Sequence, residues 1–178
     1  KPIVLYFHKP QHMQKLTSIS LILVLSCIFC STTLAQKTVE EHIKSGVKFH
    51  DAGNYKSAID AYNQAIKLDS TSSIAYYELS LTYFTLKKYE ESIKYSQKVL
   101  DLNQGNEIYA SINMGNALDN MGKSKEAILV YQQALKNYGE NYLLYYNLAL
   151  THAKKGNDAM ATEAVQKAAL NAPEHASS

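Results

Sequence analysis

The sequence predicts an all-α fold built from a repeated unit. Small residues recur at spacings of 34 or 35 along the chain, bulky residues recur between them at the same spacings, and turn residues follow the same register. A fixed period of roughly 20–50 residues is the signature of a repeat architecture, in which each unit buries its apolar surface against its neighbours.

Three slots of the period hold small residues, two hold bulky residues and one holds turn residues. The small slots contain Gly46, Ser80, Gly115 and Ala149; Ala58, Ser92, Ala127 and Ala161; and Ala65, Val99, Ala134 and Ala168. The bulky slots contain Phe49, Tyr83, Leu118 and His152, and then Tyr62, Ser96, Tyr131 and Val165. The turn slot contains Gly53, Lys87, Gly122 and Gly156.

This period and these residues resemble the tetratricopeptide repeat family. The resemblance implies a right-handed α-solenoid of four helix-turn-helix repeats within residues 36–178, at 39–72, 73–107, 108–141 and 142–175. The slot that holds Trp in the family departs from the pattern, since it contains His42, Tyr76, Ser111 and Tyr145. The second repeat carries an extra residue, which we place at Gly105.

Each small slot has an expected packing role. Close helix crossings exclude large side chains, so we expect Gly115 to face Ala127 within the third repeat. Gly122 is expected to end a helix in a left-handed turn. We also expect Tyr62, Tyr83 and Tyr131 in the core. Asn113 and Asn147 are expected to form structural hydrogen bonds within their own repeats.

A leader precedes the repeats. After Met13, Lys15 supplies a positive charge, residues 16–30 are uncharged and mostly apolar, and small residues lead to Ala35. This is the layout of a secretory signal peptide over 13–35. We therefore expect cleavage after Ala35 and a periplasmic or secreted protein.

Two alternatives for the leader stay open. Residues 16–35 would serve as an uncleaved membrane anchor, and Cys27 would serve as a lipid attachment site in a lipoprotein. Residues 1–12 are interpreted as an upstream extension. Both cysteines, Cys27 and Cys30, lie in the leader, so we expect no thiol or disulfide chemistry after cleavage.

Composition argues against nucleic-acid binding and catalysis. The chain contains no Arg, the residue best suited to bidentate phosphate recognition, and its net charge is only +2. Catalysis needs an acid, base or nucleophile held beside a partner. The histidines His42, His50, His152 and His175 are interpreted as structural or solvated. The sequence thus predicts no enzyme, no cofactor, no metal site and no small-molecule substrate.

The family resemblance implies a concave groove, lined by the first helix of each repeat, that binds a protein or peptide. The implied groove residues are mostly aromatic or aliphatic: Ile43, Val47, His50, Tyr77, Leu81, Phe84, Tyr109, Ile112, Asn116, Tyr146 and Leu150, with Asp119 and Lys154 beside them. Aromatic anchors dominate recognition energy at protein interfaces. Asn116 is expected to pair with a ligand backbone amide.

Some members of the family grip acidic C-terminal peptides with Lys, Arg and Asn. The corresponding slots here contain Ile43, Val47, Glu78, Tyr109 and Asn113. Because the positive charges are missing, such a partner is not expected.

Two other functional classes remain open. One is a self-associating structural module that forms a homodimer through its C-terminal helix, where Ala164 and Ala168 are expected on an uncovered surface. The other is a membrane-tethered or lipoprotein adaptor in envelope assembly, which requires the leader to be retained or lipidated.

Overall fold

The computed structural model describes residues 38–173. The predicted leader over 13–35, its cysteines and His175 lie outside the described residues. The architecture below belongs to the unit Val39–Ser178.

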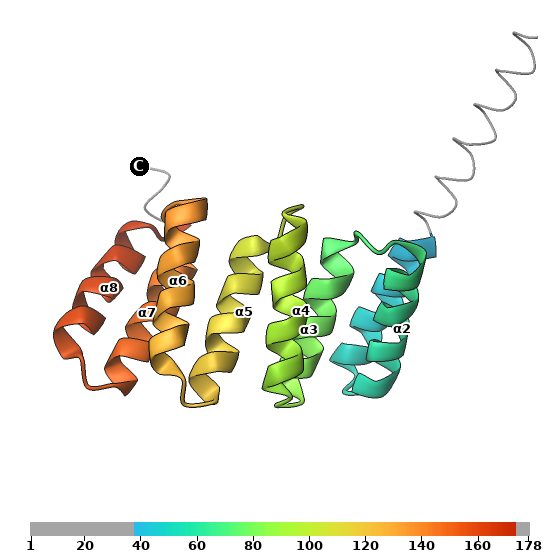
Figure 1. The fold of residues 1–178 in the computed structure, drawn as a ribbon, viewed down its shortest axis with the longest axis horizontal. Coiled ribbons are helices and arrows are strands. Elements are labelled where there is room, and N and C mark those ends of the chain that lie inside the picture. Colours follow the sequence, from blue (N-terminus) through green and yellow to red (C-terminus); the bar gives the residue numbers. More distant parts are fainter. Residues whose placement is uncertain (1–37, 174–178) are drawn as a thin grey trace, which may run out of the picture. The chain divides into compact units, whose positions relative to one another are not determined.

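The described part of this unit consists of helices joined by short turns, and it contains no strand. Residues 38–51 are helical and precede α2 (Tyr55–Leu68), α3 (Ser73–Thr85), α4 (Tyr89–Leu102), α5 (Glu107–Asn120), α6 (Ser124–Tyr138), α7 (Tyr142–Lys154) and α8 (Asp158–Leu170). Figure 1 shows them side by side as successive hairpins. The predicted all-α solenoid is confirmed.

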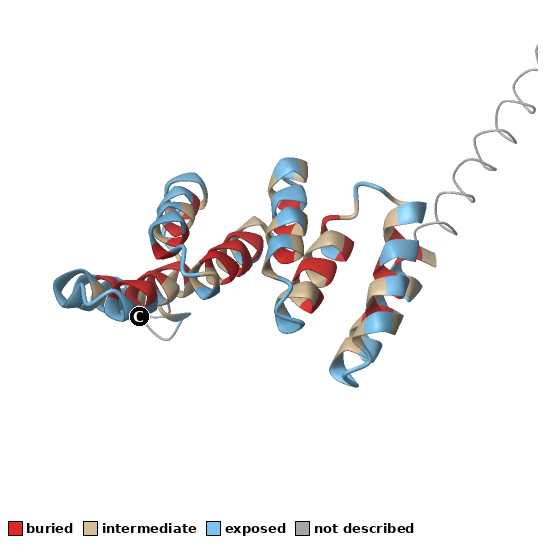
Figure 2. Ribbon diagram, turned by 60° about the horizontal axis from the view of Figure 1, so that its bottom comes forward, coloured by how far each residue is buried: buried red, intermediate tan, exposed pale blue. Residues whose placement is uncertain are grey.

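The helices form two layers. Within hairpins, α3 packs against α4, α5 against α6 and α7 against α8, while α4 packs against α5 between hairpins. The first helices of successive hairpins also touch, since α3 contacts α5 and α5 contacts α7. We call residues 38–51, α3, α5 and α7 the first-helix layer, and α2, α4, α6 and α8 the second-helix layer. Buried residues lie on the helix sides that face neighbouring helices (Figure 2).

The turn inside each hairpin uses a left-handed residue. Gly53, Gly122 and Gly156 have φ values of +74°, +79° and +72°. Lys87 occupies the same slot with φ +59°, although a side chain disfavours this conformation. The left-handed turn predicted at Gly122 is therefore present, and the second hairpin forms the same turn without glycine.

The crossing in the third hairpin differs from the expectation. Gly115 faces the ring of Tyr131, whereas Ala127 was expected there: a Cβ at Gly115 would lie 2.8 Å from the Tyr131 hydroxyl oxygen and closer still to the ring, and these are its nearest neighbours. Gly46 faces Tyr62 in the same way, with its Cβ position 2.7 Å from Cδ1. The missing side chain of Gly115 makes room for Tyr131, which lies one helical turn beyond Ala127, the residue expected at this crossing.

The second hairpin replaces this packing with a polar network. Ser80 stands in the slot of Gly115, and Ser96 stands in the slot of Tyr131. The Asn113 amide on α5 donates to Ser80 Oγ at 2.9 Å, Ser92 Oγ at 3.2 Å and Ser96 Oγ at 3.5 Å. All four side chains are buried. Asn113 therefore joins two repeats, whereas a bond within one repeat was expected. Ser96 fits its slot because hydrogen bonding replaces a bulky ring.

The expected core tyrosines divide into two groups. Tyr62 and Tyr131 are fully buried. Tyr83 is half-buried and stacks on Tyr95 with ring centroids 5.4 Å apart. His152 is 6% exposed, which places it in the core as its slot predicted.

Helix α8 shows a different surface from the one expected. Ala164 is 4% exposed and Ala168 is half-buried against the main apolar cluster. The exposed large apolar residues of α8 are Met160, Val165 and Leu170, and Ala159 and Ala169 are exposed beside them. The prediction that Ala164 and Ala168 form the uncovered surface was wrong, because both alanines pack toward α7. A dimer through α8 would use the exposed residues instead.

Candidate binding surface on the first helices

The eleven predicted groove residues all lie in the first-helix layer. Most fall in two slots four residues apart, which places them on one side of each helix. One slot contains Ile43, Tyr77, Ile112 and Tyr146, and the other contains Val47, Leu81, Asn116 and Leu150. Together with His50, Phe84 and Tyr109, they define what we call the first-helix face.

Exposure varies along this face. Tyr109, Tyr146 and Leu150 are about half exposed, at 50%, 53% and 52%, whereas the other eight side chains are partly covered. Tyr77 and Tyr109 come from α3 and α5, and their ring centroids lie 6.1 Å apart. The structure thus brings aromatic side chains of successive first helices together on one surface.

Asn116 already has a partner inside the protein. The buried hydroxyl of Tyr131 donates to Asn116 Oδ1 at 2.7 Å, so this oxygen is occupied by the core. The side-chain amide hydrogens of Asn116 have no partner among residues 38–173 and stay available to a ligand acceptor. Of the ligand contact predicted for Asn116, only the donor side of its amide is left.

The two charged residues beside the face pair with each other. Lys154 Nζ lies 3.0 Å from Asp119 Oδ2 and donates to the backbone carbonyl of Asp119 at 2.9 Å. The pair joins α5 to α7. Because each charge is compensated, this end of the face presents little net charge to a partner.

The contact between residues 38–51 and α3 is organised around the buried hydroxyl of Thr82. This hydroxyl donates to the backbone carbonyl of Glu78 at 2.9 Å and lies 2.8 Å from Nδ1 of His50. Thr82 is fully buried and its proton is donated to a backbone carbonyl, so the His50–Thr82 contact ties residues 38–51 to α3.

Two carboxylates lie close to this contact. Burial raises the pKa of the Glu78 carboxyl above its ordinary value of 4.5, and the Asp51 carboxylate adds to the rise. Burial also raises the pKa of the Tyr62 phenol, and both carboxylates raise it further. In the sequence, Glu78 stands in a slot where some family members carry a positive charge, and no further role was predicted for it.

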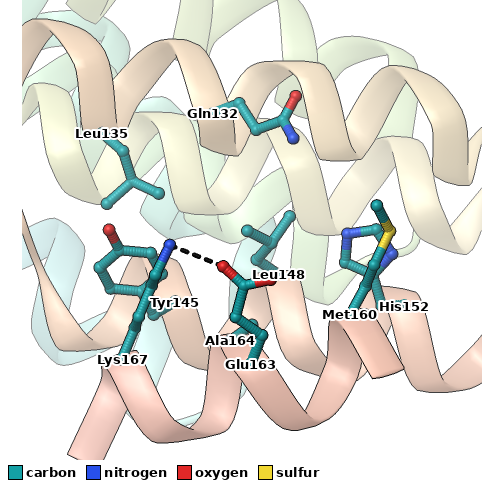
Figure 3. Close-up of a pocket in the computed structure, with 9 residues that line it drawn as sticks. All are labelled: Gln132, Leu135, Tyr145, Leu148, His152, Met160, Glu163, Ala164 and Lys167. Carbon is teal, nitrogen blue, oxygen red and sulfur yellow. Dashed lines mark ion pairs between the residues drawn. The ribbon is translucent and has the colours of Figure 1, made fainter. Parts of the chain in front are cut away.

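A separate cavity lies toward the second-helix layer, between α6, α7 and α8 (Figure 3). Its volume is about 330 Å³, and its walls include Leu135, Tyr145 and Met160. The Lys167–Glu163 ion pair, at 2.9 Å, lies on the α8 wall of this cavity. None of the eleven predicted residues lines this cavity, so it is a second surface feature distinct from the first-helix face.

Residues 38–173 contain no group of three or more His, Cys, Asp or Glu side chains placed to hold a metal ion. Their helices also include none with the length and apolar character needed to span a bilayer.

Comparison with solved structures supports the fold. A crystal structure of MamA superposes with a TM-score of 0.66 at 23% identity, covering 97% of this chain and 100% of that one. A structure of pilF from Pseudomonas aeruginosa gives a TM-score of 0.66 at 21% identity, covering 75% of this chain and 61% of that one. At these identities the likeness concerns the fold alone.

Curated relatives match over part of the chain. A TPR repeat-containing protein of Methanocaldococcus jannaschii is 26% identical over 116 residues, or 65% of this chain. DnaJ homolog subfamily C member 3 of Gallus gallus is 30% identical over 103 residues, or 58% of this chain. The matched region spans only 20% of the length of each relative.

Sequence models of one family cover most of the described residues. A model described as TPR repeat matches residues 46–87, and two described as Tetratricopeptide repeat match 70–140 and 112–176. The matched segments overlap and follow the helix hairpins in order. The chain therefore belongs to the tetratricopeptide repeat family.

Proposed function

We propose that this chain is a non-catalytic scaffold whose first-helix face binds an extended or helical segment of a partner protein. The main support is the surface itself. Tyr109, Tyr146 and Leu150 are each about half exposed on one layer, and Tyr77 continues the aromatic surface from α3. Large rigid side chains of this kind supply contact area at low entropic cost.

The polar groups of the face fit the same role. The amide hydrogens of Asn116 would donate to a backbone carbonyl of the partner, since Oδ1 is held by Tyr131. Tyr77, Asn116 and Tyr146 lie on three successive first helices, with Asn116 on the middle one. This order suits a ligand that runs along the first-helix layer.

Export through the predicted leader forms part of the proposal. A signal peptide over 13–35 would place the scaffold in the periplasm or outside the cell. A retained or lipidated leader would instead tether it to a membrane. N-terminal sequencing of the natural protein separates these cases: a chain that begins at Gln36 supports cleavage, whereas a lipid-modified Cys27 supports the lipoprotein alternative.

The binding proposal is tested by selecting a random twelve-residue peptide library on the full chain and on two variants. Tyr77→Ala/Tyr146→Ala truncates two aromatic residues of the first-helix face. Leu129→Ala/Met160→Ala is the matched control, because both side chains are exposed on the second-helix layer. Circular dichroism verifies that each variant stays helical.

We expect the parent and the control to enrich the same peptides, and the tyrosine variant to lose them. Enrichment that survives the tyrosine changes but is lost in the control would move the binding surface to the second-helix layer. A parent that enriches no peptide would contradict the proposed role.

A further inference from the structure

The second hairpin contains a stack of three aromatic rings. Tyr76 and Tyr83 lie two helical turns apart on one side of α3, and Tyr95 of α4 stacks on both of them. Its ring centroid lies 6.3 Å from that of Tyr76 and 5.4 Å from that of Tyr83, with interplanar angles of 23° and 7°. Both distances are those of favourable aromatic pairs. The protein itself therefore shows that an aromatic ring from a second helix fits between these two slots.

The fourth hairpin keeps the two flanking slots aromatic but lacks the ring between them. Tyr145 and His152 on α7 occupy the flanking slots, and Ala164 on α8 occupies the slot of Tyr95. All three line the cavity of about 330 Å³ between α6, α7 and α8. Figure 3 shows Tyr145 and His152 at opposite ends of this cavity, with Leu148 between them. The cavity thus corresponds to the place of the missing ring.

The third hairpin lacks the aromatic walls. Its flanking slots contain Ser111 and Leu118, and Val130 occupies the slot of Tyr95. A cavity of about 540 Å³ lies there as well, lined by Ser111 and Val130 among others. Because neither flanking slot contains a ring, this larger cavity offers nothing for an aromatic group to stack on.

The first hairpin lacks a third wall. It has the rings of His42 and Phe49 in the flanking slots and Ala61 in the slot of Tyr95. Within residues 38–173, however, no second helix precedes this hairpin. In the fourth hairpin that wall is formed by α6, through Gln132 and Leu135. The fourth hairpin therefore combines two aromatic ends, a small residue in the middle slot and a closing helix.

The α8 rim of the cavity is open to solvent, and its charges compensate each other. The Glu163 and Lys167 side chains are 63% and 46% exposed and pair at 2.9 Å. The Lys167 ammonium lies 5.7 Å from the centre of the Tyr145 ring, so an exposed side chain covers this face of the ring. Because acid and base are paired at the rim, a neutral group matches the cavity better than an ion does.

We propose that this cavity binds an aromatic side chain, such as Phe or Tyr, from a segment of a partner protein. The ring would stand between Tyr145 and His152, over Leu148, as Tyr95 stands between its two neighbours. Aromatic pairs of this kind contribute beyond the area that they bury. This site is a second binding surface, and it does not depend on the proposed role of the first-helix face, whose eleven residues lie elsewhere.

The test uses two blocked tripeptides, acetyl-Ala-Phe-Ala-amide and the same peptide with cyclohexylalanine, which has a six-membered ring without π electrons. Each is titrated into the labelled full chain and followed by nuclear magnetic resonance. Ala164→Tyr supplies the missing ring from α8 and should fill the cavity. Val130→Tyr is the matched control, because it makes a similar change in the equivalent slot of the third hairpin. Circular dichroism verifies that both variants stay helical.

We expect the phenylalanine peptide to give saturable shifts at Tyr145 and His152, with affinity roughly two- to tenfold above that of the cyclohexyl peptide, the contribution of an aromatic pair. These shifts should vanish in Ala164→Tyr and persist in Val130→Tyr.

Four results would overturn the inference: no saturable shift in the parent, equal affinity for the two peptides, binding that survives in folded Ala164→Tyr, or equal loss in both variants. The comparison of the two peptides on the parent decides the question even if Ala164→Tyr does not fold. None of these results bears on the first-helix face, since the library test of that face depends on Tyr77 and Tyr146.

Discussion

The Tyr131 ring fills the space over Gly115, so that a Cβ on this glycine would lie 2.8 Å from the tyrosine hydroxyl and closer still to the ring. Gly115→Ala should improve helix propensity by about 1 kcal/mol but overpack the crossing by about 1–3 kcal/mol. We expect a net loss of stability, measured by urea denaturation.

A double-mutant cycle isolates this contact. In a Tyr131→Ala background the ring is absent, so Gly115→Ala should be neutral or stabilising by up to about 1 kcal/mol. An identical effect of Gly115→Ala in both backgrounds would show that the ring does not limit the space at residue 115.

Lys87 is a position where glycine should stabilise the protein. Its φ of +59° is the left-handed conformation that glycine adopts in the equivalent turns. A non-glycine residue there costs about 1–2 kcal/mol, partly offset by the greater freedom of glycine in the unfolded chain. Lys87→Gly should therefore raise the free energy of unfolding by about 0.5–1 kcal/mol. Destabilisation in thermal melting would contradict this reading of the turn.

Asn113 should contribute more to stability than its repeat equivalent, Asn147. Asn113→Ala leaves the hydroxyls of Ser80, Ser92 and Ser96 without their shared donor in a buried site, at a cost of about 1–3 kcal/mol. Within the described part of the chain, the Asn147 amide bonds only to the Leu143 carbonyl of its own helix. Chemical denaturation of both alanine variants checks the ranking, and equal losses would mean that the serine network adds nothing.

Glu78 should make stability fall as pH rises. Its folded-state pKa is raised above 4.5 by burial and then by Asp51. The folded state therefore binds more protons than the unfolded state just above pH 4.5, and the free energy of unfolding decreases through that window. Glu78→Gln should remove this decrease and stabilise the protein at pH 7 relative to pH 4. Denaturation curves at both pH values test this, with Glu90→Gln as the exposed control.

The sequence predicts the architecture because the period records which positions must be small. Gly53, Gly122 and Gly156 mark turns in which a positive φ is needed, and their spacing locates the hairpins. The predicted face also lies on one layer, because residues four apart share a side of a helix.

Spacing does not record which side chain fills the space that a small residue leaves. Gly115 was assigned to Ala127 because both are small, yet the crossing is built from a glycine and a large ring. The pairing of Lys154 with Asp119 joins residues 35 apart and depends on how successive first helices stack. In the sequence, the first repeat has Val47 in the slot that holds Asn116 in the third repeat. This difference becomes informative only when the structure shows where Tyr62 lies.

The central claim is that the first-helix face binds a protein segment, and one affinity measurement tests it most directly. A fluorescent peptide selected on the parent is titrated by anisotropy against the parent, Tyr146→Ala and Leu129→Ala. Tyr146 is 53% exposed and Leu129 is 64% exposed, so both changes should leave the fold intact. Loss of an aromatic anchor costs about 2 kcal/mol, and we therefore predict roughly thirtyfold weaker binding for Tyr146→Ala and no change for Leu129→Ala. Unchanged affinity in Tyr146→Ala together with weakened binding in Leu129→Ala would contradict the account.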